Sequence, residues 1–172
     1  FKYMAPEVFS YKEFEYIQNH LFILSGFYGA VRPFDGVISY RLEMQAKLQG
    51  EDFKNLYDFW RGDIAKYITD GRDTVINLAS DEYFKAVKKY FPENIRVVTC
   101  VFADLENGKL KEKGVKCKMA RGELVRYMAE NNVQSPEELK KFQRQGYAYR
   151  DDLSSDDRFV FVQKKICENH RF

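Results

Sequence analysis

The segment KMARG, residues 118 to 122, has the residue types that could bind a phosphate group. We expect a helix to begin near Met119, which would place Lys118 and Arg121 at the positive end of the helix dipole. A cation there costs on the order of a few tenths of a kcal/mol. An anion bound to the free N–H groups would reverse that cost, and Gly122 would let it approach the backbone closely. The alternative is that both side chains simply point into solvent.

A second phosphate candidate is the glycine-rich stretch FILSGFYGAVRPFDG, residues 22 to 36. A helix that ends before Gly26, a turn containing Gly26 and Gly29, and a short helical turn before Pro33 would form a helix-hairpin-helix element. The turn of such an element offers backbone N–H groups to a nucleic-acid phosphate, and Arg32 would add a positive charge beside it. The usual hairpin has one residue between its glycines, whereas this one has two. The alternative is a glycine that ends the helix, followed by an ordinary turn.

Enzyme-like arrangements are weak in this sequence. Ser80 follows an expected strand and precedes an expected helix, but LASDE lacks the glycines of the G-x-S-x-G turn, which favours a helix N-cap instead. Asp81 and Glu82 could act as an acid/base pair, but acidic residues in a first helical turn are already stabilised by the helix dipole. The two histidines, His20 and His170, have no metal-binding spacing, so we expect no metal site and no cofactor.

Charge is unevenly distributed along the chain. The net charge is only +2, from 28 basic and 26 acidic residues, so bulk charge does not indicate a nucleic-acid partner. The stretch from Lys109 to Arg126, however, contains seven lysine and arginine residues and only two glutamates. We call this stretch the basic segment, and it is the part of the chain best suited to a phosphate backbone.

Length and composition fit one domain with its own core, residues 1 to 172. The cysteines, Cys100, Cys117 and Cys167, are odd in number and form no C-x-x-C pair, which favours a reducing cytoplasm. No run of about 18 apolar residues is present, so we expect no membrane span. Because the chain begins with Phe1 rather than Met, we expect a fragment or a processed chain.

Hydrophobic periodicity and turn residues predict an α+β fold. Asn107-Gly108 between two extended runs predicts a β-hairpin. The other expected strands cover residues 40–45, 74–79 and 158–163, and the expected helices cover 11–24, 53–68, 80–91, 119–130 and a short helix opened by Ser135 to Glu138.

Several long segments of the chain resemble one protein family. LSGFYGAVRPFD, YRLEMQAKL, LYDFW, VINLASDEYFKAVK and KMARGELVRYM, followed by Gly146-Tyr147, occur in the order seen in the YaaA family of bacterial peroxide-stress proteins. The resemblance covers nearly the whole chain. It implies a mixed α/β fold peculiar to that family, with a helix-hairpin-helix, and an N-terminal strand that is absent here. Loss of that strand would expose a sheet edge.

The resemblance also implies a function. It implies a cytoplasmic protein that acts under hydrogen-peroxide stress, lowers unincorporated iron and binds DNA through a positively charged cleft. Two departures weaken the DNA expectation, because many relatives have Arg at the position of Phe22 and Pro at that of Ser39. The expected phosphate-binding residues are Gly26, Gly29, Arg32, Arg41, Lys116, Lys118, Arg121 and Gly122, and the further cleft candidates are Glu43, Asn77, Ser80, Asp81, Glu82, Tyr83 and Lys85.

Three hypotheses follow. The first is a DNA-binding stress protein that contacts phosphates without reading sequence. The second is an enzyme acting on a nucleotide or nucleic acid. Direct iron binding is a third, weaker hypothesis, because two histidines without helical spacing cannot supply a usual iron site. The oligomeric state is left open. The residues of the enzyme hypothesis are Arg41, Glu43, Asn77, Ser80, Glu82, Lys118 and Arg121.

Overall fold

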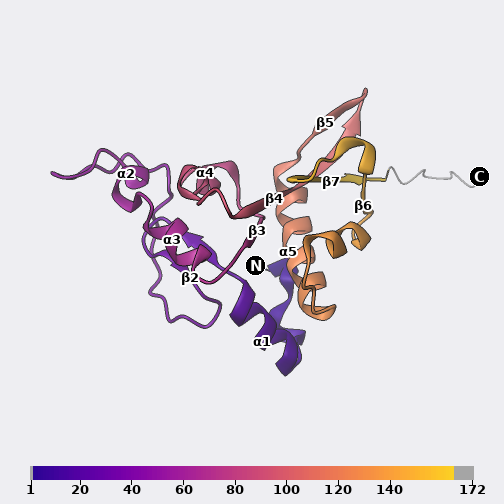
Figure 1. Cartoon of the computed structure of the whole chain (residues 1–172), viewed down its shortest axis with the longest axis horizontal. Coiled ribbons are helices and arrows are strands. Elements are labelled where there is room, and N and C mark those ends of the chain that lie inside the picture. The colour runs from indigo at the N-terminus through magenta and orange to yellow at the C-terminus, as the bar shows by residue number, and fades with distance from the viewer. Residues whose placement is uncertain (1, 165–172) are drawn as a thin grey trace, which may run out of the picture. The chain divides into compact units, whose positions relative to one another are not determined.

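The computed structural model describes residues 2–164, which fold into two compact units (Figure 1). Unit 1 is formed by residues 2–15 together with residues from Val98 onward, and unit 2 is formed by Tyr16–Val97. Helix α1, Tyr11–His20, contributes residues to both units. Each unit has its own elements and is described separately.

Unit 1 contains a mixed sheet. Strand β4, Arg96–Glu106, pairs in parallel with β7, Arg158–Gln163, and β6, Tyr147–Tyr149, pairs with β7 in the antiparallel direction. Strand β5, Lys109–Lys111, returns antiparallel to β4 through the predicted hairpin, in which Asn107 and Gly108 both have positive φ. The helices of this unit are α5, Gly114–Glu130, and the 3₁₀ turns η1, Lys2–Met4, η2, Pro6–Val8, η4, Pro136–Lys141, and η5, Asp151–Leu153.

The core of unit 1 is aromatic. Phe102 of β4 stacks on Phe161 of β7 with ring centroids 5.1 Å apart, and Phe142 meets both rings edge-on. Leu124 of α5 is fully buried in the same unit. Burial of these large side chains supplies most of the driving force for folding.

Unit 2 has short elements. Strands β1, Ile23–Ser25, and β2, Gly29–Val31, form an antiparallel hairpin. The first two residues of β4 also belong to this unit, where the N–H of Arg96 donates to the carbonyl of Asp73. The remaining elements are α2, Leu56–Trp60, α3, Asp63–Thr69, β3, Thr74–Asn77, α4, Asp81–Phe84, and η3, Lys88–Tyr90, around a core of Met44, Leu56, Ile64, Ala65, Ile68, Ala86 and Val87.

The structure confirms the α+β class but corrects several predicted boundaries. The first helix ends at His20 rather than residue 24. The helix predicted over 53–68 is two helices, because Arg61 adopts a positive φ between them. The helix predicted over 80–91 stops at Phe84, before η3 begins at Lys88. Among residues 2–164, no helix has both the length and the apolar character needed to cross a bilayer.

The segment predicted as a strand over 40–45 forms no strand. The predicted alternation survives in the burial of residues 42–44, since Met44 is fully buried and Leu42 partly buried, while Glu43 is exposed. Tyr40, which the same alternation placed on the buried face, is 42% exposed. The segment packs its main chain against Gly26 instead of pairing with another strand. Alternation therefore predicted the buried face but not the hydrogen bonds.

The helix-hairpin-helix element is not confirmed. Ala30 and Val31, which lie where a short helical turn was predicted before Pro33, belong to β2. The chain contains no helical residue between Val31 and Leu56. A β-hairpin therefore stands where the element was expected. That the whole chain is a single domain stays a prediction.

Candidate functional site

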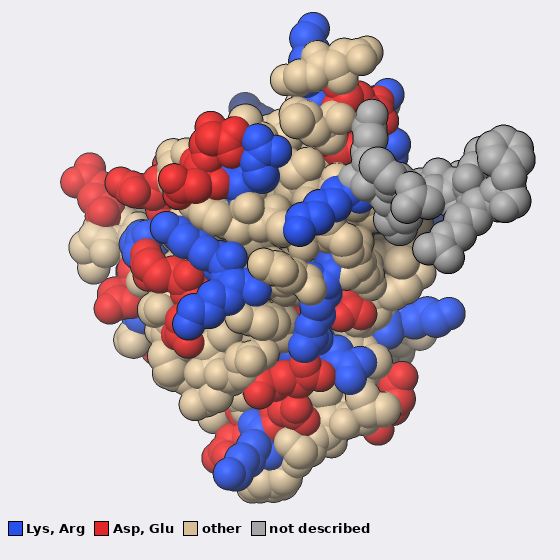
Figure 2. All heavy atoms as spheres, turned by 90° about the vertical axis from the view of Figure 1, so that its right-hand side faces the viewer, with Lys and Arg blue, Asp and Glu red and all other residues tan. Residues whose placement is uncertain are grey.

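The cations of the basic segment are largely paired in the structure. Figure 2, a view onto the right-hand side of Figure 1, shows blue and red side chains interspersed rather than a continuous basic field. Lys118 is exposed and has no ion pair among the described residues. The ion pairs of the basic segment are Lys111–Glu106, Lys113–Asp104, Lys113–Glu106, Lys116–Asp104, Arg121–Glu112 and Arg126–Glu130.

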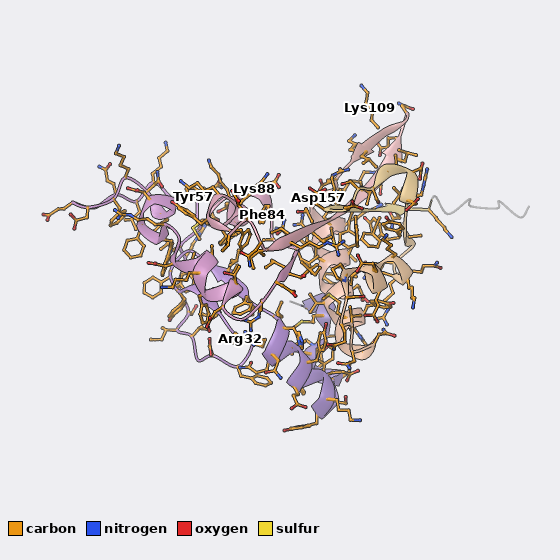
Figure 3. All side chains as sticks on the ribbon, viewed as in Figure 1. Arg32, Tyr57, Phe84, Lys88, Lys109 and Asp157 are labelled. Atoms are coloured by element: carbon orange, nitrogen blue, oxygen red, sulfur yellow. The ribbon has the colours of Figure 1, made fainter. Side chains whose placement is uncertain are left out.

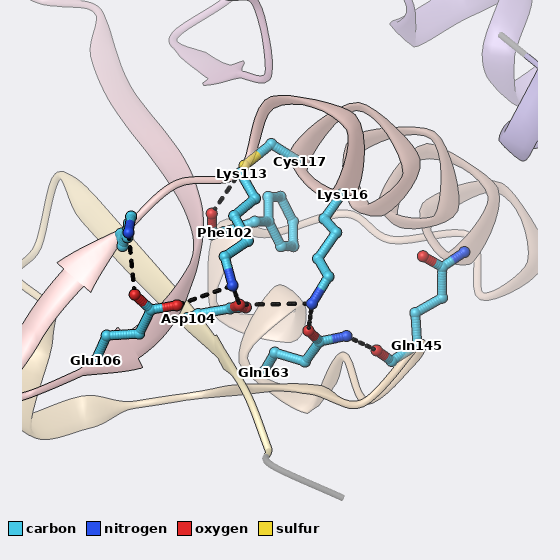
Figure 4. A network of polar contacts seen from close by, with 9 residues as sticks. Phe102, Asp104, Glu106, Lys113, Lys116, Cys117, Gln145 and Gln163 are labelled. Carbon is cyan, nitrogen blue, oxygen red and sulfur yellow. Dashed lines mark hydrogen bonds and ion pairs between the residues drawn. The ribbon is translucent and has the colours of Figure 1, made fainter.

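Asp104 is the centre of a polar network at the start of α5 (Figure 4). Its Oδ2 lies 2.6 Å from Lys113 Nζ and 3.4 Å from Lys116 Nζ. The hydrogen bond from Lys113 is the main reason that the pKa of Asp104 lies below its ordinary value, although burial acts in the opposite direction. The other carboxylate oxygen, Oδ1, is buried and has no hydrogen-bond partner among the described residues. The network thus contains one unfilled acceptor.

The network lies at the carboxyl ends of two neighbouring parallel strands. Asp104 follows Ala103, which pairs with Val162, and Gln163 follows Val162. Lys116 of α5 donates to Gln163 Oε1 at 2.6 Å. In open α/β sheets, ligands commonly bind at this edge, close to the N-termini of helices. This edge of unit 1 is therefore a reasonable place for a ligand.

Helix α5 begins at Gly114, one turn earlier than the residue 119 predicted. Lys118, Arg121 and Gly122 consequently lie within the helix and not at its N-terminus. The N–H groups suited to an anion are instead those of the first turn from Gly114, where no side chain caps the helix and no acidic residue is present. Lys116, one of the predicted phosphate-binding residues, is in that turn.

Gly122 has a packing role. A Cβ there would lie 3.1 Å from the backbone N of Met4 and 3.1 Å from the Cβ of Tyr3, so the glycine lets η1 approach α5. Arg121 lies 3.8 Å from a Glu112 oxygen, and its Nε is buried without a hydrogen-bond partner. Neither residue presents its polar atoms freely to solvent.

The glycine hairpin has internal contacts where a phosphate was expected. The N–H groups of Phe27 and Tyr28 both donate to Ser25 Oγ, at 3.2 and 2.8 Å. A Cβ at Gly26 would lie 2.7 Å from the carbonyl oxygen of Leu42, and one at Gly29 would lie 2.9 Å from the Trp60 ring. Packing explains why glycine occupies both positions, and their contact with phosphate stays a prediction.

A polar cluster in unit 2 brings together several of the predicted cleft residues around Tyr57, which is labelled in Figure 3. Glu82 Oε1 accepts from the Gln45 N–H at 3.2 Å, and Tyr57 donates to the Glu82 carbonyl. Lys85 Nζ lies 5.1 Å from the centre of the Tyr57 ring. Burial, followed by the charge of Glu82, raises the pKa of both Tyr57 and Tyr83, which keeps their hydroxyls protonated as donors.

The remaining cleft candidates in unit 2 differ in their exposure to solvent. Asn77 is only 7% exposed, and its Oδ1 accepts from the Ala79 N–H. Ser80 occupies the N-cap of α4, as predicted, but its side chain makes no capping hydrogen bond. Arg41, Glu43 and Asp81 are exposed. Because Lys116, Lys118, Arg121 and Gly122 belong to unit 1, the shared cleft stays a prediction.

Two cysteines and one histidine lie within the described residues. Cys100 and Cys117 are buried free thiols, and Cys167 lies outside the described residues. His20 donates through Nδ1–H to the Tyr16 carbonyl at 2.8 Å, and His170 also lies outside the described residues. Within residues 2–164, no group of three or more His, Cys, Asp or Glu residues is placed to hold a metal ion.

Comparison with known proteins decides the family. The sequence model described as peroxide stress protein YaaA matches residues 1–153. The chain belongs to this family. A UPF0246 protein of Desulfitobacterium hafniense is 53% identical over 163 residues, covering 95% of this chain and 65% of the relative. One of Agathobacter rectalis is 51% identical over 164 residues, covering 95% of this chain and 66% of the relative.

The chain thus spans just under two thirds of the length of these YaaA-family relatives. Membership supports a stress-related role connected with peroxide. The sequence had indicated the family, but it had not indicated Asp104 or Gln163 as parts of a site. The sequence could have indicated them, because each is a polar residue at the end of an otherwise apolar strand, β4 for Asp104 and β7 for Gln163.

Proposed function

We propose that this chain, as part of a YaaA-family peroxide stress protein, binds DNA through sequence-independent phosphate contacts and helps to limit iron-mediated damage. The observation that carries the proposal is the start of α5. The helix begins at Gly114 without a capping side chain or an acidic residue in its first turn. Free N–H groups at a helix N-terminus favour a bound anion.

Lysines around this helix start supply the charge. Lys113 occupies the N-cap, Lys116 lies in the first turn, and Lys118 follows in the next turn. Lys113 and Lys116 form ion pairs with Asp104, and a phosphate can replace Asp104 as their partner. The two lysine side chains are 42% and 43% exposed, so a phosphate in solvent can reach them. Such contacts carry no base information.

The proposal is tested by binding of a fluorescent DNA duplex across a salt series. Each phosphate contact that is lost makes the plot of log affinity against log salt concentration less steep by about 0.9. We expect that change in Lys116→Ala and in Lys118→Ala. Lys141→Ala is the matched control, because Lys141 is an exposed lysine in the last turn of η4. The proposal would be refuted by a DNA affinity that does not change with salt concentration. It would also be refuted if Lys116→Ala and Lys118→Ala bound DNA with the same salt dependence as Lys141→Ala.

The damage-limiting part needs a separate measurement. Plasmid DNA exposed to ferrous iron and hydrogen peroxide accumulates nicks, and bound protein should reduce them. We expect protection by the unmodified chain and by Lys141→Ala, and weaker protection by the Lys116→Ala, Lys118→Ala double variant. Equal protection by the unmodified chain and both variants would show that damage limitation does not depend on DNA binding at α5.

An enzyme acting on a nucleotide or nucleic acid is the second candidate, and the polar cluster of unit 2 favours it. There, Glu82, Tyr83 and Lys85 lie along one short segment, with the Tyr57 hydroxyl bonded to its backbone. A carboxylate beside protonated tyrosines is a possible acid/base arrangement. Turnover of nucleotides or DNA that Glu82→Gln abolishes would support this function, whereas turnover unchanged in Glu82→Gln would exclude this cluster.

A further inference from the structure

Two arginines of unit 2 share one aromatic ring. The guanidinium carbon of Arg32 lies 4.3 Å from the centre of the Phe22 ring, and that of Arg72 lies 4.9 Å from the same point. Arg32 is labelled in Figure 3. Phe22 packs against the core of unit 2 and meets Tyr67 edge-on at 5.4 Å, so the ring is held in place. The ring therefore fixes two cations close to one another.

Each guanidinium is anchored, yet neither is neutralised. Arg32 donates through Nη2 to the Gln18 carbonyl, and Arg72 donates through Nη1 to the Asp70 carbonyl at 2.6 Å. Asp35, the acidic group that acts on Arg32, accepts from the backbone N–H of Arg32 at 2.7 Å. Among the described residues, neither guanidinium forms an ion pair.

The positive charges of Arg32 and Arg72 repel one another. Burial, and then the charge of Arg72, lower the pKa of Arg32, and Tyr67 and Asp35 offset this only in part. Each guanidinium has five N–H donors, of which a single bond to a carbonyl uses one. Both arginines and Phe22 are partly exposed, so solvent reaches the pair. An anion at this place would relieve the repulsion and fill the unused donors.

We infer that Arg32 and Arg72 form a binding site for a phosphate group. The two guanidinium carbons lie 4.3 and 4.9 Å from the centre of the same ring, and the charge of Arg72 acts on Arg32, so one anion can interact electrostatically with both. Planar guanidinium groups bind phosphate oxygens in pairs, and less of their side-chain entropy is lost when they are already anchored. Arg32 was expected to contact phosphate beside the glycine turn, whereas Arg72 was not expected to take part.

The site goes beyond the proposed function and does not depend on it. It belongs to unit 2, whereas the helix start that carries the proposed function belongs to unit 1. Failure of either one therefore leaves the other standing. Inorganic phosphate is a suitable first probe because it presents the recognised group without bases or sugar.

The test is a titration of the chain with inorganic phosphate, followed by nuclear magnetic resonance of the arginine side chains. We expect saturable shifts of the Arg32 and Arg72 signals and about tenfold weaker binding in Arg72→Ala. Arg61→Ala is the matched control, since Arg61 is exposed, donates to the Asp58 carbonyl and has no ring contact among the described residues. No saturable shift, or equal weakening by both variants, would overturn the inference.

Two further variants separate geometry from charge and one site from the other. Arg72→Lys keeps the charge without the planar donors, and we expect it to bind phosphate several-fold more weakly than the unmodified chain. The Lys116→Ala, Lys118→Ala double variant should retain phosphate binding at Arg32. Loss of the Arg32 shift in that double variant would place the phosphate elsewhere and refute the site.

The source of the phosphate is resolved with short oligonucleotides. A trinucleotide with a 5′-phosphate presents a terminal group, whereas the same trinucleotide without it presents only diesters. Binding of the phosphorylated form alone would assign the site to terminal phosphates, and equal binding of both would assign it to the backbone. Binding of neither form, with inorganic phosphate bound, would restrict the site to the free anion.

Discussion

Trp60 is hydrogen-bonded to Gly26, with its indole Nε1 donating to the Gly26 carbonyl oxygen at 3.0 Å. The same ring occupies the space that a side chain at Gly29 would need. The glycine hairpin is therefore closed from one side by α2, which ends at Trp60. The Trp60 ring therefore accounts for the glycine at position 29, and the main chain of Leu42 accounts for the glycine at position 26, without a bound ligand.

Gly26→Ala should destabilise the chain by roughly 1 to 3 kcal/mol, because its Cβ would lie 2.7 Å from the Leu42 carbonyl oxygen, a main-chain atom. Urea denaturation measures the loss. Gly36→Ala is the control, since a Cβ there meets nothing within 4 Å. We also expect faster amide exchange around Met44 in Gly26→Ala, and unchanged exchange there would contradict the packing described.

Gly29→Ala should be more destabilising than Gly108→Ala. Both glycines have a φ of +75°, which costs a residue with a side chain about 1 kcal/mol, but only at Gly29 would the new Cβ meet Trp60, at 2.9 Å. A difference of roughly 1 kcal/mol or more between the two free energies of unfolding is expected. Equal losses would show that the Trp60 ring moves aside freely.

Asp104→Asn should lower stability at neutral pH by about 1 kcal/mol, through loss of the charged partner of Lys113 and Lys116. The Asp104 pKa is lower in the folded chain than its ordinary value of 3.8, so the carboxylate stabilises the fold above that pH. Its contribution disappears as the pH falls further, through the folded pKa. The difference between the unmodified chain and Asp104→Asn should therefore shrink below about pH 4.

Denaturation curves between pH 2.5 and 7 measure this effect. Asp73→Asn is the matched control, because Asp73 is exposed and forms no ion pair among the described residues. A difference between the unmodified chain and Asp104→Asn that stays constant over this range would show that the network does not depend on the charge of Asp104.

Cys100 and Cys117 should react slowly with thiol reagents and with hydrogen peroxide at neutral pH. Burial raises the pKa of Cys100 to about 12 and also raises that of Cys117, so little of either thiol is thiolate. The measurement is labelling by a chromogenic disulfide in Cys167→Ser, which leaves these two thiols. We expect labelling at least tenfold faster after unfolding, and equally fast labelling of the folded chain would be the contrary result.

Local signals in the sequence predicted local structure well. Asn107-Gly108 predicted the β4–β5 hairpin, and both residues have the positive φ that such turns require. Ser135 and Glu138 form the predicted capping box. The strand predicted over 158–163 has the same bounds in the structure, because its apolar run has a clear end at Gln163. In each case, neighbouring residues alone determine the geometry.

Features that depend on distant residues were not predictable. The start of α5 was missed because Lys113 is an N-cap without a capping side chain, so the sequence contains no helix-start signal there. Lys116 meets Asp104 and Gln163 only because β4 pairs in parallel with β7, about 60 residues along the chain. Arg72 joins Arg32 through a ring, and neither spacing nor residue type indicates that contact.

Unit 1 is formed by residues that precede unit 2 in the sequence together with residues that follow it. During synthesis, the continuous stretch Tyr16–Val97 can complete its contacts as soon as it leaves the ribosome, since domains tend to form as units from the N-terminal side. Tyr3 and Met4 must wait for Gly122, against which they pack. Residues that precede unit 2 in the chain are thus fixed only after residues that follow it, and closing so long a loop slows folding.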